Sequence, residues 1–294
     1  MTDTKHPSGA PWRNFYGRFK GHNLRDRQQA YLEEDLAKLS PGAVGWEENP
    51  NRDNLDLEGL FGDKPLWLEI GFGGGEHLIH QAVQNPDVGL IGAEPYINGV
   101  AMLLGKIREL DAPNLRVHAG DVRDLFDVLP DGCVSKVFLN YPDPWPKKRH
   151  HRRRFVTHEH LQALAKVMAI GAELRVATDI EDYVRQTLEE VPRAGFEWIA
   201  ESAADWKEPW SDWVSTRYEQ KALREGRTPH YLTFVRETLS QRVASASDYE
   251  FIWQDEDAAH GRGNVLGVSR GLNLTSNESL AHVVSWHSCS DVLL

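Results

Sequence analysis

A regular alternation of apolar runs and amphipathic segments constrains the fold of this chain more than any other feature. Apolar runs typical of buried strands occupy residues 66–70, 88–93, 115–119, 134–139 and 174–178, and two further strands are expected at 196–200 and 231–235. Segments with helical periodicity separate the first five. Repeated strand–helix–strand units predict an α/β fold, with a parallel sheet covered by helices on both faces. Ligands in such sheets bind at the carboxyl ends of the strands.

Two flanking segments do not follow this alternation, so we assign the domain itself to residues 64–236. Residues 1–63 interleave aromatic and basic side chains and contain one short helix, expected from Arg27 to Leu39, where Pro41-Gly42 ends it. We expect an N-terminal appendage that is partly flexible. Residues 237–294 are rich in Ser, Asp, Gly and Asn, which predicts an atypical, poorly ordered C-terminal extension.

The composition narrows the class of protein. No apolar run approaches the roughly 20 residues of a membrane helix, and the polar start lacks the apolar core of a signal peptide. The two cysteines, Cys133 and Cys289, are far apart, which argues against a disulfide framework or a structural zinc. We therefore expect a cytoplasmic protein without a membrane segment or a metal. The net charge of -11 excludes a general nucleic-acid coat but allows a local basic face.

The run Gly71-Phe72-Gly73-Gly74-Gly75 lies between the first strand and the following helix. Glycines at such a position let the backbone approach a ligand closely. A dinucleotide site is the competing interpretation. Its fingerprint needs a third glycine where Glu76 stands, and a carboxylate there would repel a pyrophosphate.

Acidic residues follow the first three strands: Glu69, Glu94 and Asp121. S-adenosylmethionine carries a cationic sulfonium, an ammonium, a ribose diol and an adenine amine, which suit acidic groups at successive strand ends. We expect Glu94 to accept from both ribose hydroxyls, Asp121 to lie near the adenine, and Glu69 to face the amino-acid end directly or through water. Each acid alone could be a solvated strand-end residue; three in register beside the glycine run favour the cofactor.

The segment from Asn140 to Arg154 carries the second site. A buried-looking strand leads into Asp143, which stands between two prolines and is followed by Trp145 and a nearly unbroken cationic run. A lone acid on a rigid turn beside an aromatic ring suits a flat, hydrogen-bonding ring, and the cations suit a polyanion. Together they indicate chemistry on a base within a nucleic acid. A solvated charged face is the alternative, weakened because the run contains no balancing acids.

These motifs give the chain a specific resemblance. Glu69–Gly75, Gly92–Tyr96, Asn140–Trp145, Ala177–Asp179 and Thr216–Glu219 resemble the bacterial tRNA (guanine-46-N7)-methyltransferase family, over about residues 12–236. The glycine run alone would indicate only a class I methyltransferase. The resemblance implies one Rossmann-like domain with a seven-stranded, mostly parallel sheet. It also implies S-adenosylmethionine as cofactor, tRNA as substrate, and a monomer or homodimer. The tail from about Glu237 has no counterpart in the family.

The chemistry of guanine N7 assigns the reacting residue. This nitrogen has a free lone pair and no proton, so the protein needs no general base; it must align the atoms at about 3–3.5 Å and exclude water. Asp143 is expected to accept from guanine N1–H and N2–H and to lie close enough to contact the cofactor. The alternative is that Asp143 only caps the next turn. Trp145 either stacks on a base or packs beneath the turn, and packing is favoured.

The resemblance implies further contacts. The cofactor set comprises Glu69, Gly71, Gly73, Glu94, Asp121 and Asp143. Substrate contacts are implied for Lys147 and Asp179 and for Thr216, Arg217, Tyr218 and Glu219, which we expect on one short loop. The residues expected to bind tRNA phosphates are Arg149, His150, His151, Arg152, Arg153 and Arg154.

Three other functional classes compete with this one. A class I methyltransferase acting on a protein or a small molecule would leave the cationic run unexplained, and one acting on a different RNA is a further alternative. A non-catalytic RNA-binding protein with a relic fold is disfavoured by the intact set Glu69, Glu94, Asp121 and Asp143. A nicotinamide oxidoreductase is disfavoured by Glu76.

Overall fold

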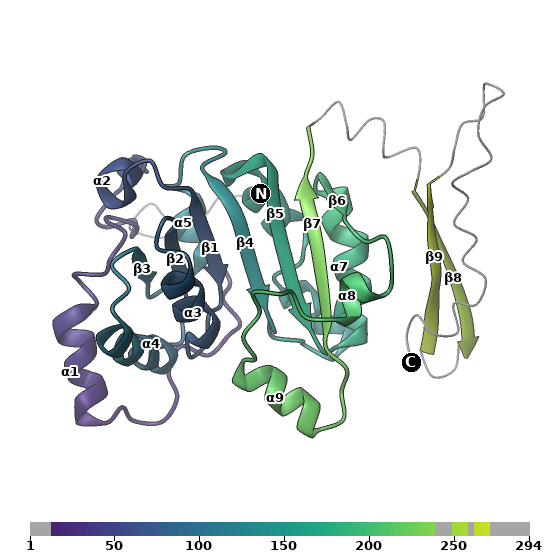
Figure 1. Cartoon of the computed structure of the whole chain (residues 1–294), viewed down its shortest axis with the longest axis horizontal. Coiled ribbons are helices and arrows are strands. Elements are labelled where there is room, and N and C mark those ends of the chain that lie inside the picture. Colours follow the sequence, from purple (N-terminus) through teal and green to yellow (C-terminus); the bar gives the residue numbers. More distant parts are fainter. Residues whose placement is uncertain (1–12, 239–248, 258–261, 271–294) are drawn as a thin grey trace. The chain divides into compact units, whose positions relative to one another are not determined.

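The computed structural model describes residues 13–238, 249–257 and 262–270. The chain divides into two compact units, residues 1–236 and 237–294. The first unit contains a seven-stranded sheet of order β3-β2-β1-β4-β5-β7-β6 (Figure 1). Its strands are β1 (Leu66–Ile70), β2 (Gly89–Ala93), β3 (Leu115–His118), β4 (Val134–Asn140), β5 (Met168–Thr178), β6 (Phe196–Trp198) and β7 (His230–Arg236).

The sheet is mostly parallel, as predicted. Strand β1 pairs in parallel with β2 and β4, β2 with β3, and β4 with β5, whereas β7 is antiparallel to both β5 and β6. The strand order reverses at β1, which lies between β2 and β4. A crevice therefore forms beyond the carboxyl ends of these strands, the usual ligand position in such a sheet.

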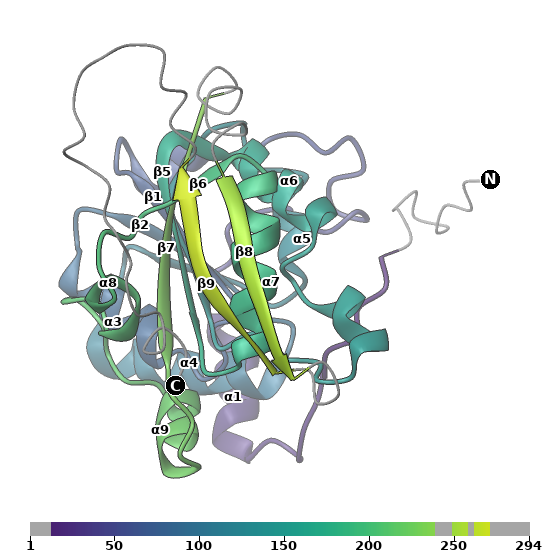
Figure 2. The ribbon, with the colours of Figure 1, turned by 90° about the vertical axis from the view of Figure 1, so that its right-hand side faces the viewer.

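Helices cover both faces of the sheet, which confirms the α/β prediction. Figure 2 shows α5, α6 and α7 on one side and α3 and α8 on the other. The helices of this unit are α1 (Asp26–Asp35), α2 (Leu57–Phe61), α3 (Glu76–Gln84), α4 (Ile97–Leu110), α5 (Val122–Phe126), the 3₁₀ helix η1 (Lys148–Arg153), α6 (His158–Val167), α7 (Glu181–Arg193), α8 (Ala204–Lys207) and α9 (Arg217–Arg224). None of the described helices is long and apolar enough to cross a membrane.

The core lies between the helices and the strands. One cluster joins α1, α3 and α4 to β2 and β3 through buried side chains that include Tyr31, Leu78, Leu103 and Leu115. Leu78 and Ala82 on α3, and Val100 and Leu104 on α4, are four residues apart and fully buried, so burial of these apolar stripes holds the two helices to the sheet. The glycine loop that follows β1 is thereby anchored at both ends.

Strand β5 begins earlier than expected. The apolar run Leu174–Thr178 predicted its second half, whereas the strand starts at Met168, directly after α6. The pairing with β4 is irregular between Val134 and Lys136, and Gly171 adopts a positive φ of 80°. Residues of this irregular stretch continue the helical hydrophobic pattern of α6, so periodicity alone placed them in the helix.

The N-terminal segment packs against the sheet domain. Tyr31 on α1 is buried beside α4, and Arg13 pairs with Asp124 and Asp127 at 2.7 and 2.8 Å. Residues 13–63, expected as an appendage, thus lie in the same compact unit as the sheet. How far they move in solution stays a prediction.

The second unit contains a two-stranded antiparallel sheet, β8 (Tyr249–Asp257) and β9 (Arg262–Arg270). We expected no strands in this stretch, because its apolar residues are scattered among Ser, Asp and Gly. The expectation of poor order in residues 237–294 otherwise stays a prediction, and residues 239–248, 258–261 and 271–294 lie outside the described part.

Candidate active site

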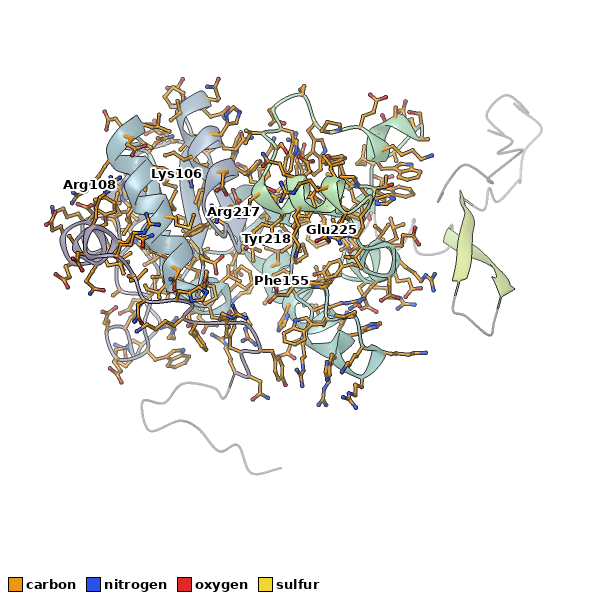
Figure 3. All side chains as sticks on the ribbon, turned by 90° about the horizontal axis from the view of Figure 1, so that it is seen from below. Lys106, Arg108, Phe155, Arg217, Tyr218 and Glu225 are labelled. Carbon is orange, nitrogen blue, oxygen red and sulfur yellow. The ribbon has the colours of Figure 1, made fainter. Side chains whose placement is uncertain are left out.

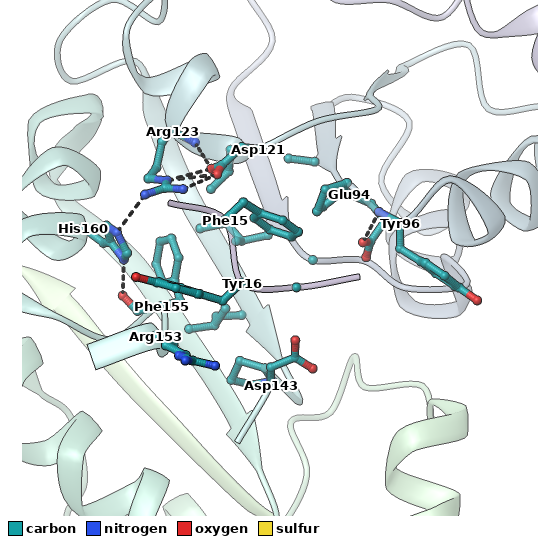
Figure 4. Close-up of a pocket in the computed structure, with 18 of the residues that line it drawn as sticks. Phe15, Tyr16, Glu94, Tyr96, Asp121, Arg123, Asp143, Arg153, Phe155 and His160 are labelled. Carbon is teal, nitrogen blue, oxygen red and sulfur yellow. Dashed lines mark hydrogen bonds and ion pairs between the residues drawn. The ribbon is translucent and has the colours of Figure 1, made fainter. Parts of the chain in front are cut away.

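A cavity of about 830 Å³ opens beyond the carboxyl ends of β1, β2 and β4. Its walls come from the N-terminal segment, the glycine loop, the ends of β2 and β4, the start of α5, η1 and α9 (Figure 4). The predicted site residues among its lining are Gly71, Gly73, Glu94, Asp121, Asp143, Arg152, Arg153 and Tyr218. The structure therefore brings together parts of the predicted cofactor, base and RNA sites in one place.

The glycine loop turns sharply at this cavity. Gly71, Gly73 and Gly75 have positive φ values of 70°, 55° and 73°, which L side chains rarely adopt. Gly75 caps α3, and its amide donates to the Phe72 carbonyl at 2.8 Å. A Cβ on Gly73 would lie 3.0 Å from the ring of Tyr218, so the backbone itself forms this wall of the cavity.

Glu94 is held beneath the loop by backbone amides. Its carboxylate accepts from the Gly73 amide at 2.7 Å and from the Tyr96 amide at 2.8 Å, and the residue is 8% exposed. Burial raises the pKa of Glu94; these two amides oppose the rise, and the nearby charges of Asp143 and Glu69 add to it. The group is thus a positioned acceptor whose charge lacks a compensating cation among its described contacts.

Asp121 caps α5 at the edge of the cavity. Its carboxylate accepts from the Arg123 amide at 2.9 Å and from Arg123 Nε at 3.0 Å. Burial disfavours its charge, but the hydrogen bonds from Arg123 outweigh burial and lower the pKa of Asp121. This acid stays ionised and faces the cavity with its charge already neutralised by Arg123.

Glu69 differs from the other two acids. Its side chain is 2% exposed, accepts from His77 Nδ1 at 2.7 Å and is absent from the described lining of the cavity. Gln81 lies 3.3 Å from the other ring nitrogen of His77, so the three side chains form a buried chain behind the loop. The expected contact of Glu69 with a cofactor stays a prediction; the contact present is with α3.

Glu76, which distinguished this loop from a dinucleotide site, forms ion pairs. Arg217 of α9 and Lys106 of α4 both contact its Oε1 atom. Figure 3 shows Lys106, Arg217 and Tyr218 lying close together. Burial disfavours the charge of Glu76, yet Arg217 and Lys106 outweigh it and lower its pKa. The first turn of α9 is in this way fixed to the glycine loop.

The turn that follows β4 presents Asp143 to the cavity. Tyr141 and Trp145 on either side of it have positive φ values of 48° and 42°, a strained conformation for side chains of this size. The cavity walls partly desolvate the carboxyl group and raise the pKa of Asp143, against the attraction of Arg18. The described contacts include no hydrogen bond from the following turn to Asp143, so the structure gives no support to the alternative of a capping residue.

Trp145 lines the cavity and packs there against other side chains. Its ring meets Tyr16 edge-on at 6.3 Å, and the guanidinium of Arg153 lies 5.0 Å above it. The same guanidinium lies 4.7 Å from the ring of Tyr16. The Arg153 guanidinium therefore contacts both rings, and Figure 4 shows Arg153 beside Asp143.

The segment Thr216–Glu219 requires a correction. It is the first turn of α9, capped by Thr216, and not a loop. Glu219 is 4% exposed, and its oxygens accept from Trp213 Nε1 and from the hydroxyls of Tyr231 and Tyr141, so its expected contact with a substrate stays a prediction. Tyr218 alone of the four lines the cavity.

The cationic run also requires a correction, because Arg154 is not available to RNA. It is 1% exposed and donates to Pro144, Asp182 and Gln186. His151 lies 3.2 Å from Asp182. Arg149 and Arg152 of η1 are exposed, and Arg152 lines the cavity. The acid that balances Arg154, Asp182, comes from α7, far along the chain, so the local sequence did not reveal it.

Two other predicted substrate residues lie outside the described lining of the cavity. Lys147 is exposed at the start of η1. Asp179 follows β5, and its side chain is paired with Arg227. Their contacts with a substrate stay predictions.

The N-terminal segment supplies lining residues that we had not assigned: Arg13, Asn14, Phe15, Tyr16, Gly17 and Arg18. The Phe19 carbonyl accepts from the Ile97 amide at 3.0 Å, which ties this segment to the start of α4. The interleaved aromatic and basic residues were the available signal. Nothing local, however, indicates that they return to the strand ends.

The described residues contain no group of three or more His, Cys, Asp or Glu side chains arranged to hold a metal ion. Cys133 has a free thiol whose pKa burial raises to about 11. Cys289 lies outside the described residues.

Comparisons with known proteins agree with this arrangement. A family profile described as a putative methyltransferase matches residues 63–232. The tRNA (guanine-N(7)-)-methyltransferase of Jannaschia sp. (strain CCS1) is 72% identical over 239 residues, which cover 81% of this chain and 100% of that protein. Proteins of the same name from Ruegeria sp. (strain TM1040) and Rhodospirillum rubrum are 71% and 48% identical. Their matches cover 79% and 76% of this chain and 91% and 87% of theirs.

Proposed function

The chain belongs to the family of tRNA (guanine-N7)-methyltransferases, and on this premise we propose that it transfers a methyl group from S-adenosylmethionine to N7 of guanine 46 in the variable loop of tRNA. The observation that supports this proposal most strongly is that Glu94 and Asp143 face one cavity beside the glycine loop. One acid is fixed by backbone amides on the cofactor side, and the other stands on the turn next to the cationic helix.

The donor set of the cavity fits S-adenosylmethionine. Burial and the nearby charges of Asp143 and Glu69 raise the pKa of Glu94. This part of the cavity therefore favours a ligand that brings positive charge and hydroxyl donors. Glu94 would hold the ribose hydroxyls, and Asp121 the adenine side. The cofactor, when bound, supplies an electrophilic methyl group on a sulfonium.

The protein's own part in the reaction is to bind, orient and exclude water. Guanine N7 carries a lone pair and no proton, so no side chain has to remove one. Asp143 would accept from N1–H and N2–H of the guanine, which selects guanine against adenine, since adenine has no such pair of donors. Tyr218 and the rings of Tyr16 and Trp145 form apolar walls around this position.

The exposed cations of η1 support a tRNA substrate. Arg152 lines the cavity, and Arg149 is exposed on the same short helix, where phosphates flanking an extruded base would lie. We also propose that the enzyme is a monomer or a homodimer. We place the enzyme in the cytoplasm, because its substrate is tRNA.

The proposed position is tested with two tRNA transcripts that differ only at nucleotide 46. The full chain is incubated with S-adenosylmethionine and either the guanine-46 transcript or one with adenine at this position. Methyl incorporation into the first alone is expected. Equal incorporation into both would overturn the assignment to position 46, and incorporation into neither, but into ribosomal RNA or protein, would overturn the substrate class.

A further inference from the structure

Arg154 contacts the turn that carries Asp143. Its Nε donates to the carbonyl of Pro144 at 2.8 Å. Pro144 directly follows Asp143 and precedes Trp145, whose φ of 42° departs from the ordinary range. A backbone conformation of this kind persists only where surrounding contacts hold it.

The rest of the guanidinium is fixed by α7. Nη2 donates to the Asp182 carboxylate at 2.7 Å, and Nη1 donates to Gln186 Oε1 at 2.8 Å. Asp182 and Gln186 are four residues apart and so lie on one face of the helix. The Arg154 guanidinium also lies 5.2 Å from the ring of Tyr183. With 1% of its surface exposed, Arg154 spans the gap between α7 and the turn, and no part of it reaches solvent for a phosphate.

We propose that Arg154 is a positioning residue for Asp143: it fixes the Asp143-Pro144-Trp145 turn against α7 so that the carboxylate meets the guanine edge. This inference rests on the proposed role of Asp143. It separates Arg154 from the neighbouring cations, which project from the rim of the cavity. The planar fork of arginine is required, because one side chain must donate in three directions from a buried position.

The test compares Arg154→Lys with the matched control Arg193→Lys in the full chain, because Arg193 is an exposed arginine in the last turn of α7 that pairs with Glu190. Lysine keeps the charge but cannot make the three-way contact. For Arg154→Lys, we expect kcat at saturating tRNA to fall by about tenfold or more, with the Kd for tRNA and its salt slope unchanged. Arg193→Lys should leave kcat near the wild-type value. Weaker tRNA binding with a smaller salt slope and an intact kcat would overturn the proposal.

A double-mutant cycle with Asp143→Asn distinguishes positioning from general damage. If Arg154 acts through Asp143, Arg154→Lys should change kcat by less than about twofold in the Asp143→Asn background. Full additivity would contradict the proposal. Gln186→Leu, which removes one partner while Arg154 remains, should lower kcat in the same direction if Arg154→Lys does not fold. An unaltered kcat in Gln186→Leu would then count against the proposal. Wild-type turnover in Asp143→Asn would contradict the proposed role of Asp143 itself. This outcome differs from those that contradict the role of Arg154, so the two hypotheses can be tested separately.

Discussion

Glu94 and Asp143 divide the cavity between them, and their surroundings set their charges differently. Two backbone amides fix Glu94, whereas Asp143 stands on a strained turn within reach of the charge of Arg18. For each acid, desolvation raises the pKa. A ligand that brings hydrogen-bond donors or positive charge would therefore stabilise the ionised form of each carboxyl group.

Glu94→Gln should weaken binding of S-adenosylmethionine. Gln turns one acceptor oxygen into a donor that faces the amide of Gly73 or Tyr96 and removes a charge-assisted bond to the ribose. Charge-assisted hydrogen bonds contribute about 1.5–3 kcal/mol, so Kd should rise about ten- to a hundredfold. Calorimetry measures this, with Glu58→Gln on the exposed face of α2 as the control. An unchanged Kd in Glu94→Gln would remove Glu94 from the cofactor site.

The pH dependence of cofactor binding follows from the same shift. The pKa of Glu94 is raised in the folded protein, so the folded state binds this proton more tightly than the unfolded chain. Ionisation of Glu94 therefore costs stability in the folded protein. This cost is present above the folded pKa of Glu94 and declines as the pH falls through that pKa. Cofactor binding needs the ionised form. Affinity should therefore decline on acidification at a higher pH than for an ordinary Glu, and Glu94→Gln should flatten this decline. An equal decline in both proteins would assign it to another group.

Asp143→Asn should abolish most turnover on an unmodified tRNA transcript. One acceptor becomes a donor opposite the guanine donors, which costs several kcal/mol, or roughly a thousandfold, of transition-state binding. Single-turnover kinetics measure this loss, with Asp87→Asn on the surface as a control. Turnover near the wild-type rate would rule out the role of Asp143.

The cations of the 3₁₀ helix η1 and of the residue that caps it lie in two different environments. Its exposed cations face solvent at the rim, while Arg153 stacks on Tyr16 and Trp145 and the capping residue Arg154 enters the core. A charge count over the run treats these cations as equivalent. Only the packing against α7 separates them.

Arg149→Ala combined with Arg152→Ala should weaken tRNA binding and flatten its salt dependence. Each lost phosphate contact reduces the log–log slope by about 0.7–0.9. Lys64→Ala with Lys166→Ala is the matched control, because these lysines lie near the amino ends of β1 and β4. Titrations of tRNA at several salt concentrations measure the slopes. Equal slopes in all three proteins would show that η1 only carries solvated charge and that the Arg13–Arg27 segment holds the RNA.

Local patterns predicted the parts of the site that are contiguous in sequence. The glycine run, Glu94 and Asp121 follow apolar strands, and their place at the carboxyl ends follows from parallel pairing. Contacts over long sequence separations were not predictable. The paired states of Glu76, Asp179 and Glu219 depend on residues up to 141 positions away. The position of the aromatic N-terminal segment in the cavity wall was not predicted for the same reason, because its contact with α4 leaves no local signal in the sequence.

The boundary between the two compact units falls after Arg236, where the sequence analysis also placed the end of the domain. The first contains the cavity and the whole of the region matched by the family profile. The match to the Jannaschia relative covers the whole of that protein but 81% of this chain. We therefore expect the catalytic function to reside in the first unit.

Truncation after Arg236 should leave a folded and active enzyme. The cavity and its supporting core lie before this residue, and the removed segment is acidic enough to compete with RNA for the basic helix. We expect guanine methylation at least as fast as in the full chain, with a cooperative thermal unfolding transition at the same midpoint. A truncated protein that does not fold would show that residues 237–294 support the sheet.

The most direct test of the whole assignment is the identity of the methylated atom. The full chain is incubated with tRNA transcript and S-adenosylmethionine carrying a labelled methyl group, and the RNA is digested to nucleosides for mass spectrometry against standards. The arrangement of Glu94 and Asp143 predicts that the label is recovered as 7-methylguanosine. Recovery of the label in another nucleoside, or at another atom of guanosine, would contradict it.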